Sequence, residues 1–197
     1  VSSIWPEAQF GVGPTINDGF YYDIYLPNHA ISESDFPLIE AKMGEIINSD
    51  LVFERQEKTI EEALLWAREA SQPFKVELLD DIKKFGTTFM KELDTNDTMP
   101  AADKSVTLYK LGNYVDLCRG PHLDSASEVG AFKLTKVAGA YWRGDENKQQ
   151  MQRVYGVAFE DKIKLDEYLS QIEEAKQRDH RKLGKELGIF MLSDYGP

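Results

Sequence analysis

The chain has 197 residues and a formal net charge of −11. Its 42% apolar and 29% charged residues are ordinary for a soluble globular protein, and its length suits one sizeable domain or one domain with an appendage. No apolar run is long enough to cross a bilayer and no signal segment opens the chain, so we expect no membrane partner. The acidic balance argues against wrapping nucleic acid over a broad surface, so any RNA contact would need a local basic patch.

Two further features bear on the origin of the chain. It contains a single cysteine, which excludes an internal disulfide framework and fits a reducing compartment, so we expect a cytoplasmic protein. It opens on Val1 without an initiator Met, so we expect a fragment of a longer protein.

The first half of the chain predicts strands and helices in turn. Val1 to Trp5 has the character of a helix end that Pro6 stops. Apolar residues at helical spacing predict a helix over 34–47, and the capping box T-I-E-E at 59–62 predicts the start of another. The other predicted elements are strands over 9–12, 20–26 and 51–57 and a short helix over 74–82.

The second half predicts adjoining strands and then one long helix. A polar segment with many turn-forming residues at 94–104 is typical of a loop. Several strands adjoin without an intervening helix, so we expect an α+β fold with a largely antiparallel sheet, packed helices and a long C-terminal helix. The predicted elements are strands over 105–110, 114–117, 131–136 and 152–159 and a helix over 161–187 that Gly188 ends.

The segment D-L-C-R-G-P-H, which starts at Asp116, holds the only cysteine and one of the three histidines. Cys118 and His122 are two potential zinc ligands, but zinc needs three or four, and Gly120-Pro121 forbids a helix that would present both on one face. The other two histidines lie in different settings. We therefore expect no closed zinc site within the chain and no cofactor, and zinc at Cys118 and His122 is kept as an alternative.

Two other interpretations of this segment stay open. Cys118 could be a nucleophile with His122 as its base and Asp116 orienting the imidazole. Alternatively, the segment is a strand end followed by a turn, with a buried thiol and a packed imidazole. Short motifs match by chance often, so the segment alone favours this second, purely structural interpretation.

The segment Y-W-R-G-D at 141–145 offers aromatic rings and an arginine, a combination that suits contacts with RNA ends. A tryptophan is more often a core residue, and we favour that position for Trp142. Arg143 is a candidate for a hairpin salt bridge with Asp145.

Five segments, taken in order, resemble the editing domain of threonyl-tRNA synthetase, and five ordered matches are far more specific than one. The last of them is similar to the linker helix that leads into the aminoacylation core of that family. The segments are F-G-V-G-P-T-I-N-D-G-F-Y-Y-D-I at 10–24, D-L-C-R-G-P-H at 116–122, F-K-L-T-K-V-A-G-A-Y-W-R-G-D at 132–145, Q-R-V-Y-G-V-A-F at 152–159 and R-D-H-R-K-L-G-K-E-L at 178–187.

The resemblance implies an editing domain over 1–159 and a linker helix over 160–197. It also implies that two parts lie outside the chain: an upstream helix with an H-x-x-x-H pair, and the class II core that would bind ATP and threonine. We therefore expect the fragment to be a monomer with little or no editing activity, cut from a homodimeric enzyme.

The editing reaction of the family follows from a limit on binding. Threonine and serine differ by one methyl group, which a binding pocket can use for only about 1–3 kcal/mol of discrimination. A second site therefore hydrolyses the ester between serine and the threonine tRNA. Such a site needs a positioned water, a group that takes its proton and donors for the developing oxyanion.

By resemblance, five residues of this chain match positions of that editing site. His122 would position or deprotonate the water, and Lys75 would stabilise charge on the substrate or the transition state. Asp116 would hold the cationic amino group of the substrate. Cys118 would form a polar wall of the pocket and Tyr22 would line it or contact the terminal adenosine.

The resemblance also implies residues that contact the substrate tRNA. Arg119 lies within the D-L-C-R-G-P-H segment and is a candidate substrate-binding residue. Arg178, Arg181 and Lys182 crowd the second half of the predicted terminal helix and are candidates for phosphate contacts in the acceptor arm. A solvated helix face with internal ion pairs explains the same charges, and both interpretations stay open.

Two functions of other classes compete with editing by a synthetase domain. One is a zinc-dependent or free-standing aminoacyl-tRNA deacylase, which metal analysis would reveal. The other is a non-catalytic module that binds the tRNA acceptor arm, which would show affinity for tRNA without deacylation.

Overall fold

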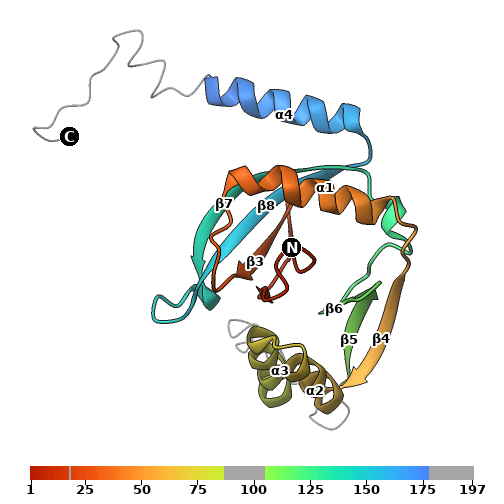
Figure 1. Ribbon diagram of the computed structural model, residues 1–197, viewed down its shortest axis with the longest axis vertical. Helices are drawn as coiled ribbons and strands as arrows, with labels where there is room; N and C mark the ends of the chain where they lie inside the picture. Colours follow the sequence, from red (N-terminus) through yellow and green to blue (C-terminus); the bar gives the residue numbers. More distant parts are fainter. Residues whose placement is uncertain (18, 87–104, 178–197) are drawn as a thin grey trace, which may run out of the picture.

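The computed structural model describes residues 1–17, 19–86 and 105–177, in which helices pack on two antiparallel sheets (Figure 1). This arrangement confirms the α+β class. The strands are β1 (Gln9–Phe10), β2 (Thr15–Ile16), β3 (Gly19–Tyr25), β4 (Phe53–Thr59), β5 (Ser105–Leu111), β6 (Tyr114–Leu117), β7 (Ala131–Tyr141) and β8 (Gln150–Phe159). The helices are α1 (Phe36–Ile47), α2 (Ile60–Glu69), α3 (Pro73–Phe85) and α4 (Lys162–Gln177).

The larger sheet has the strand order β1-β3-β8-β7, with β2 paired to β3. Helix α1 covers one face of it, because Phe36 and Ile39 are buried in one cluster with Ile24 of β3 and Val154 of β8. Helix α4 packs on β7 and β8 and lies on the far side of the sheet from α2 and α3 (Figure 1). Its buried Leu165 anchors that contact.

The smaller sheet has the order β4-β5-β6, and α2 and α3 pack beside it. The capping box predicted at the start of α2 is present: the backbone N–H of Glu62 donates to the Thr59 hydroxyl at 3.2 Å, and the Thr59 N–H donates to the Glu62 carboxylate at 2.8 Å. The buried side of α2 carries Ala63 and Leu64, which pack with Leu79 of α3 and Val106 of β5.

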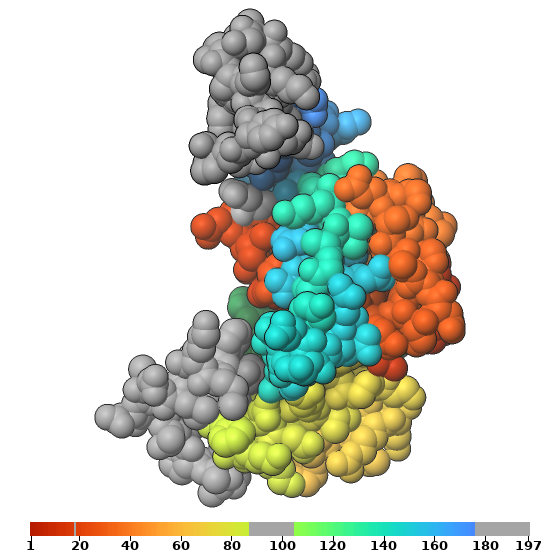
Figure 2. All heavy atoms as spheres, turned by 90° about the vertical axis from the view of Figure 1, so that its left-hand side faces the viewer, coloured from red at the N-terminus to blue at the C-terminus, as the bar shows by residue number. Residues whose placement is uncertain are grey.

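Helix α3 also contacts the larger sheet, at the end of the β7–β8 hairpin. Phe74 lies in one buried cluster with Trp142, which is 2% exposed, and Met151. The carboxylate of Glu77 accepts hydrogen bonds from the Trp142 indole at 2.9 Å and from Lys148 at 2.7 Å. Figure 2 shows this hairpin region lying directly against the α2–α3 region. Helix α3 is therefore held between the two sheets.

Residues 1–5 form a single turn in which the N–H groups of Ile4 and Trp5 donate to the carbonyl of Val1, the bonds expected of a last helical turn. One sequence-based expectation is corrected. Arg143 forms ion pairs with Glu77 and Asp81 of α3, not a hairpin pair with Asp145, because α3 brings two carboxylates against it.

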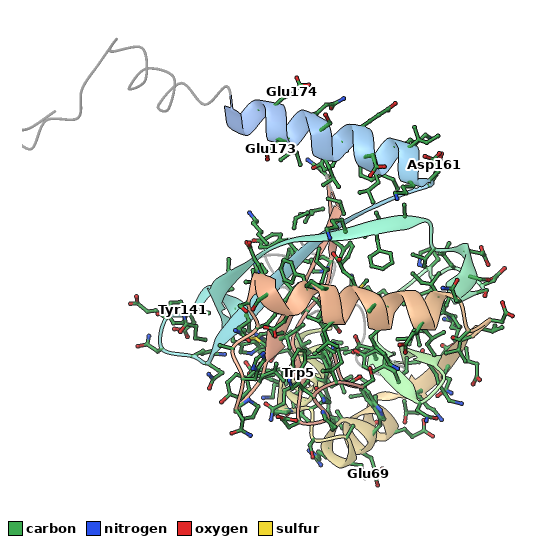
Figure 3. The ribbon with its side chains drawn as sticks, turned by 45° about the horizontal axis from the view of Figure 1, so that its top comes forward. Trp5, Glu69, Tyr141, Asp161, Glu173 and Glu174 are labelled. Carbon is green, nitrogen blue, oxygen red and sulfur yellow. The ribbon has the colours of Figure 1, made fainter. Side chains whose placement is uncertain are left out.

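Other elements run further than expected or fall outside the described residues. Strand β7 continues to Tyr141, which lies at the end of the sheet (Figure 3). Helix α3 continues to Phe85. Helix α4 begins after Asp161 and is described to Gln177. The loop predicted at 94–104 and the predicted helix residues after 177 lie outside the described residues.

Within the described part of the chain, no helix combines the length and the apolar character needed to cross a bilayer. The division of the chain into a domain over 1–159 and a linker helix over 160–197 stays a prediction.

Candidate active site

Three of the predicted site residues meet in one cluster, and each comes from a different element. The Lys75 ammonium of α3 lies 2.6 Å from Oδ1 of Asp116 on β6. The Tyr22 phenol of β3 donates to Oδ2 of the same carboxylate and accepts a hydrogen bond from Lys75 at 3.3 Å. Residues far apart in the chain therefore form one hydrogen-bonded group where α3 meets the two sheets.

Burial makes this group sensitive to the loss of any member. Only 3% of the Lys75 side chain is exposed, against 17% for Asp116. A buried ammonium is tolerated only when it is paired, and the removal of one partner typically costs about 3–5 kcal/mol. Lys75 is therefore a buried residue whose charge is compensated by Asp116.

Tyr114 is a fourth member of this group that the sequence did not suggest. It precedes Asp116 by two residues on β6, so both side chains lie on one face of the strand. Its phenol lies near Tyr22 and Asp116, and both of these groups act on its pKa. The two-residue spacing in Y-V-D indicates that Tyr114 and Asp116 share one face of a strand. It does not show that this face of β6 lies against Lys75.

The phenols of Tyr22 and Tyr114 are kept neutral by their surroundings. Burial raises the pKa of both, and the nearby Asp116 charge raises it further. Asp116 also accepts a hydrogen bond from the N–H of Leu117 at 2.8 Å. The carboxylate thus has donors on both oxygens, and a cationic ligand would have to share it with Lys75 and the phenols.

Cys118 lies directly after the last residue of β6, and its N–H donates to the carbonyl of Thr107 at 3.1 Å. Its sulfur accepts from the N–H of Gly120 at 3.4 Å, so the thiol helps to shape the turn. Among the described residues, no hydrogen bond joins this thiol to His122, so the geometry does not favour a Cys–His nucleophile pair. The same part of the chain contains no group of three or more metal-ligating side chains.

His122 lies on the surface with its ring held between aromatic side chains. Its imidazole stacks on Tyr109 of β5 with ring centroids 3.9 Å apart and an interplanar angle of 11°. Phe53 of β4 meets it edge-on at 5.0 Å. Partial burial lowers the pKa of His122, and the Asp116 charge opposes this effect without reversing it. A neutral imidazole is the form that can accept a proton from water.

The remaining predicted residues are not part of this cluster. Arg119 is exposed, and no contact among the described residues connects it to Tyr22, Lys75 or Asp116. The predicted phosphate-binding residues Arg178, Arg181 and Lys182 lie outside the described residues.

One family model matches the part of the sequence that carries several of the site residues. The model of the "Threonyl and Alanyl tRNA synthetase second additional domain" matches residues 106–155, which include Tyr109, Asp116, Cys118 and His122.

Relatives match the chain over nearly its whole length. A threonine–tRNA ligase of Dehalococcoides mccartyi is 47% identical over 192 residues, which are 98% of this chain and 29% of the relative. Threonine–tRNA ligases of Clostridioides difficile and Bdellovibrio bacteriovorus are each 46% identical over 100% of this chain and 28% of their own length. The chain thus spans under a third of the length of these relatives. Nearly the whole chain is therefore similar to one region of threonine–tRNA ligases, and residues 106–155 within it match the model of the second additional domain.

Proposed function

We propose that the chain is the editing domain of a threonine–tRNA ligase and that, within the full-length enzyme, it hydrolyses the ester bond of seryl-tRNA specific for threonine. The isolated fragment is expected to have little or no activity. The observation that carries this proposal is the convergence of Tyr22, Lys75 and Asp116, together with the stacking of His122 on Tyr109, which lies opposite Asp116 in the sheet. The five ordered sequence segments and the relatives named as threonine–tRNA ligases support the same function.

The residues of this cluster, together with His122 and Cys118, supply the groups that ester hydrolysis needs. His122 supplies a neutral imidazole at the surface, where it accepts a proton from an attacking water. Lys75 supplies a fixed positive charge that stabilises the oxyanion formed at the ester carbonyl. Attack by water needs no covalent intermediate, so Cys118 serves as a wall of the pocket.

Asp116 has two tasks in this proposal. It holds the Lys75 ammonium at 2.6 Å. It also accepts a hydrogen bond from the ammonium group of the seryl moiety, which replaces the hydrogen bond from the Tyr22 phenol. Tyr22 and Tyr114 remain neutral because their pKa values are raised, so they are donors that a substrate can displace without a change of charge. Rejection of threonine then rests on steric exclusion of its additional methyl group.

The proposal is tested on the full-length ligase that contains this chain, with tRNA mischarged with serine. Replacement of His122 by Ala should slow the release of serine by about 10²–10⁴-fold, the usual contribution of a general base. His29→Ala is the matched control, since His29 stacks on Trp5 and bonds to Asp35 away from the cluster. It should leave the rate unchanged.

Three outcomes would contradict the proposal. Unchanged release in His122→Ala would remove this residue from the mechanism. Binding of tRNA without any release of serine by the wild type would indicate a non-catalytic acceptor-arm module. Release that a chelator abolishes and zinc restores would indicate a metal-dependent deacylase.

A further inference from the structure

Tyr109 connects two residues of the candidate active site. On β5 it lies directly opposite Asp116 of β6, so the two side chains emerge on the same face of the sheet. Its ring then lies under the imidazole of His122, nearly parallel to it and 3.9 Å away. Tyr109 is itself fixed, because only 9% of it is exposed. One rigid side chain therefore lies beside Asp116 and at the same time supports the imidazole of His122.

Ring contacts alone hold His122 within the described part of the chain. No hydrogen bond to either imidazole nitrogen is present there, and the nearest ring besides Tyr109 is Phe53. A catalytic histidine usually has one nitrogen fixed by a hydrogen bond to a carboxylate or carbonyl group. Here the plane of the ring is set by stacking, and neither nitrogen has a hydrogen-bond partner among the residues that the structure describes.

The turn that carries His122 is built around Tyr109. Gly120 has φ of +71°, and a Cβ at this position would lie 2.1 Å from the Tyr109 hydroxyl oxygen. Only glycine fits both the backbone conformation and the close approach. The turn can therefore close tightly over the Tyr109 ring and place His122 on it.

We propose that Tyr109 is a positioning residue that fixes the orientation of the His122 imidazole relative to Asp116. The role assigned to it in deacylation rests on the proposed function; the fixed orientation does not. The aromatic ring carries this role, and the hydroxyl group does not. A ring displaced by about 1 Å can lower a rate by about 10²-fold, so the loss of the stack should appear in kcat.

Two variants of Tyr109 distinguish the effect of its aromatic ring from the effect of its apolar volume. Tyr109→Phe keeps the stack, and Tyr109→Leu keeps an apolar side chain without a ring. Leu108→Ala is the control for lost packing, because Leu108 is 2% exposed and its side chain lies on the opposite face of β5. It should destabilise the fold without moving His122.

Nuclear magnetic resonance of the imidazole gives a readout that does not depend on activity. The chain has three histidines, so the His122 signals can be assigned with His122→Gln. Stacking on Tyr109 should shift its ring protons upfield. Tyr109→Leu should abolish that shift. It should also raise the pKa of His122 toward its ordinary value, because the imidazole becomes less buried while the charge of Asp116 still acts on it. Tyr109→Phe and Leu108→Ala should leave the signals in place.

The rate measurement completes the test on the full-length ligase. Tyr109→Leu should lower kcat for serine release by about 10- to 100-fold with little change in KM, and Tyr109→Phe should restore nearly the whole rate. An unmoved His122 signal in Tyr109→Leu, or a rate loss no greater than in Leu108→Ala, would overturn the proposal. If the wild type releases no serine, the proposed function fails, and the imidazole signals still decide whether Tyr109 fixes the ring.

Discussion

At the scale of single residues, the Lys75–Asp116 ion pair is the feature that tolerates substitution least, because Lys75 is buried. A buried lysine is stable in its charged form only beside its counter-ion and the phenol of Tyr22. The sequence could suggest Lys75 and Asp116 separately by resemblance. It could not place them 2.6 Å apart, because that distance depends on how α3 docks against β6.

Replacement of Asp116 by Asn should therefore cost about 3–5 kcal/mol of unfolding free energy, because it leaves the Lys75 charge buried and unpaired. Urea denaturation measures this change. The matched control is Lys42→Ala, which breaks an exposed ion pair with Glu45 and should cost at most about 1 kcal/mol. Equal losses in the two variants would contradict the buried pair.

The phenols of the cluster predict a loss of stability in alkali. The pKa of Tyr114 is raised by folding, so the unfolded chain releases this proton first, at about pH 10. The contribution of Tyr114 to stability is complete below that pH and is lost as the pH rises above it. Urea unfolding between pH 8 and 11 should show a fall that Tyr114→Phe reduces.

The control for the alkaline fall is Tyr141→Phe, which changes an exposed ring at the end of β7 (Figure 3). It should leave the pH dependence as in the wild type. A fall of the same size in Tyr114→Phe and in the wild type would show that this phenol is not desolvated.

At the scale of elements, α3 decides whether the site exists, since it carries Lys75 between the two sheets. Burial of Glu77 acts to raise the pKa of this carboxyl, but hydrogen bonds from Lys148 and Trp142 lower it overall, so Glu77 remains charged and holds the helix to the hairpin. Packing of Phe74 on Trp142 at 5.0 Å completes the contact.

Replacement of Glu77 by Ala should cost about 1–3 kcal/mol and increase the hydrogen exchange of α3 amides, because the buried indole N–H loses its acceptor. Glu69→Ala, at the exposed end of α2 (Figure 3), is the control and should leave the exchange of α3 unchanged. Equal exchange in the two variants would show that Glu77 does not hold α3.

Elements with local signals were predicted well from the sequence. The capping box located the start of α2, and alternating residues located β6 at 114–117. Contacts between elements carry no such signal. Tyr109 and Tyr114 became visible as site residues only through the pairing of β5 with β6 and the approach of β3, and Arg143 found its partners on α3 and not on its own hairpin.

At the scale of the whole molecule, the acidic charge and the proposed RNA substrate make different demands. A net charge of −11 repels a polyanion in general, so recognition of tRNA must be local. The Lys75–Asp116 pair carries no net charge and Lys75 is buried, so other residues must supply the local basic patch. Arg178, Arg181 and Lys182 stay the predicted candidates for this contact.

The most direct test compares two esters on the same tRNA. The full-length ligase should release serine from seryl-tRNA(Thr) far faster than it releases threonine from threonyl-tRNA(Thr), and the difference should vanish in a variant with both Lys75→Met and His122→Ala. Equal rates of release for the two amino acids in the wild type would contradict the account.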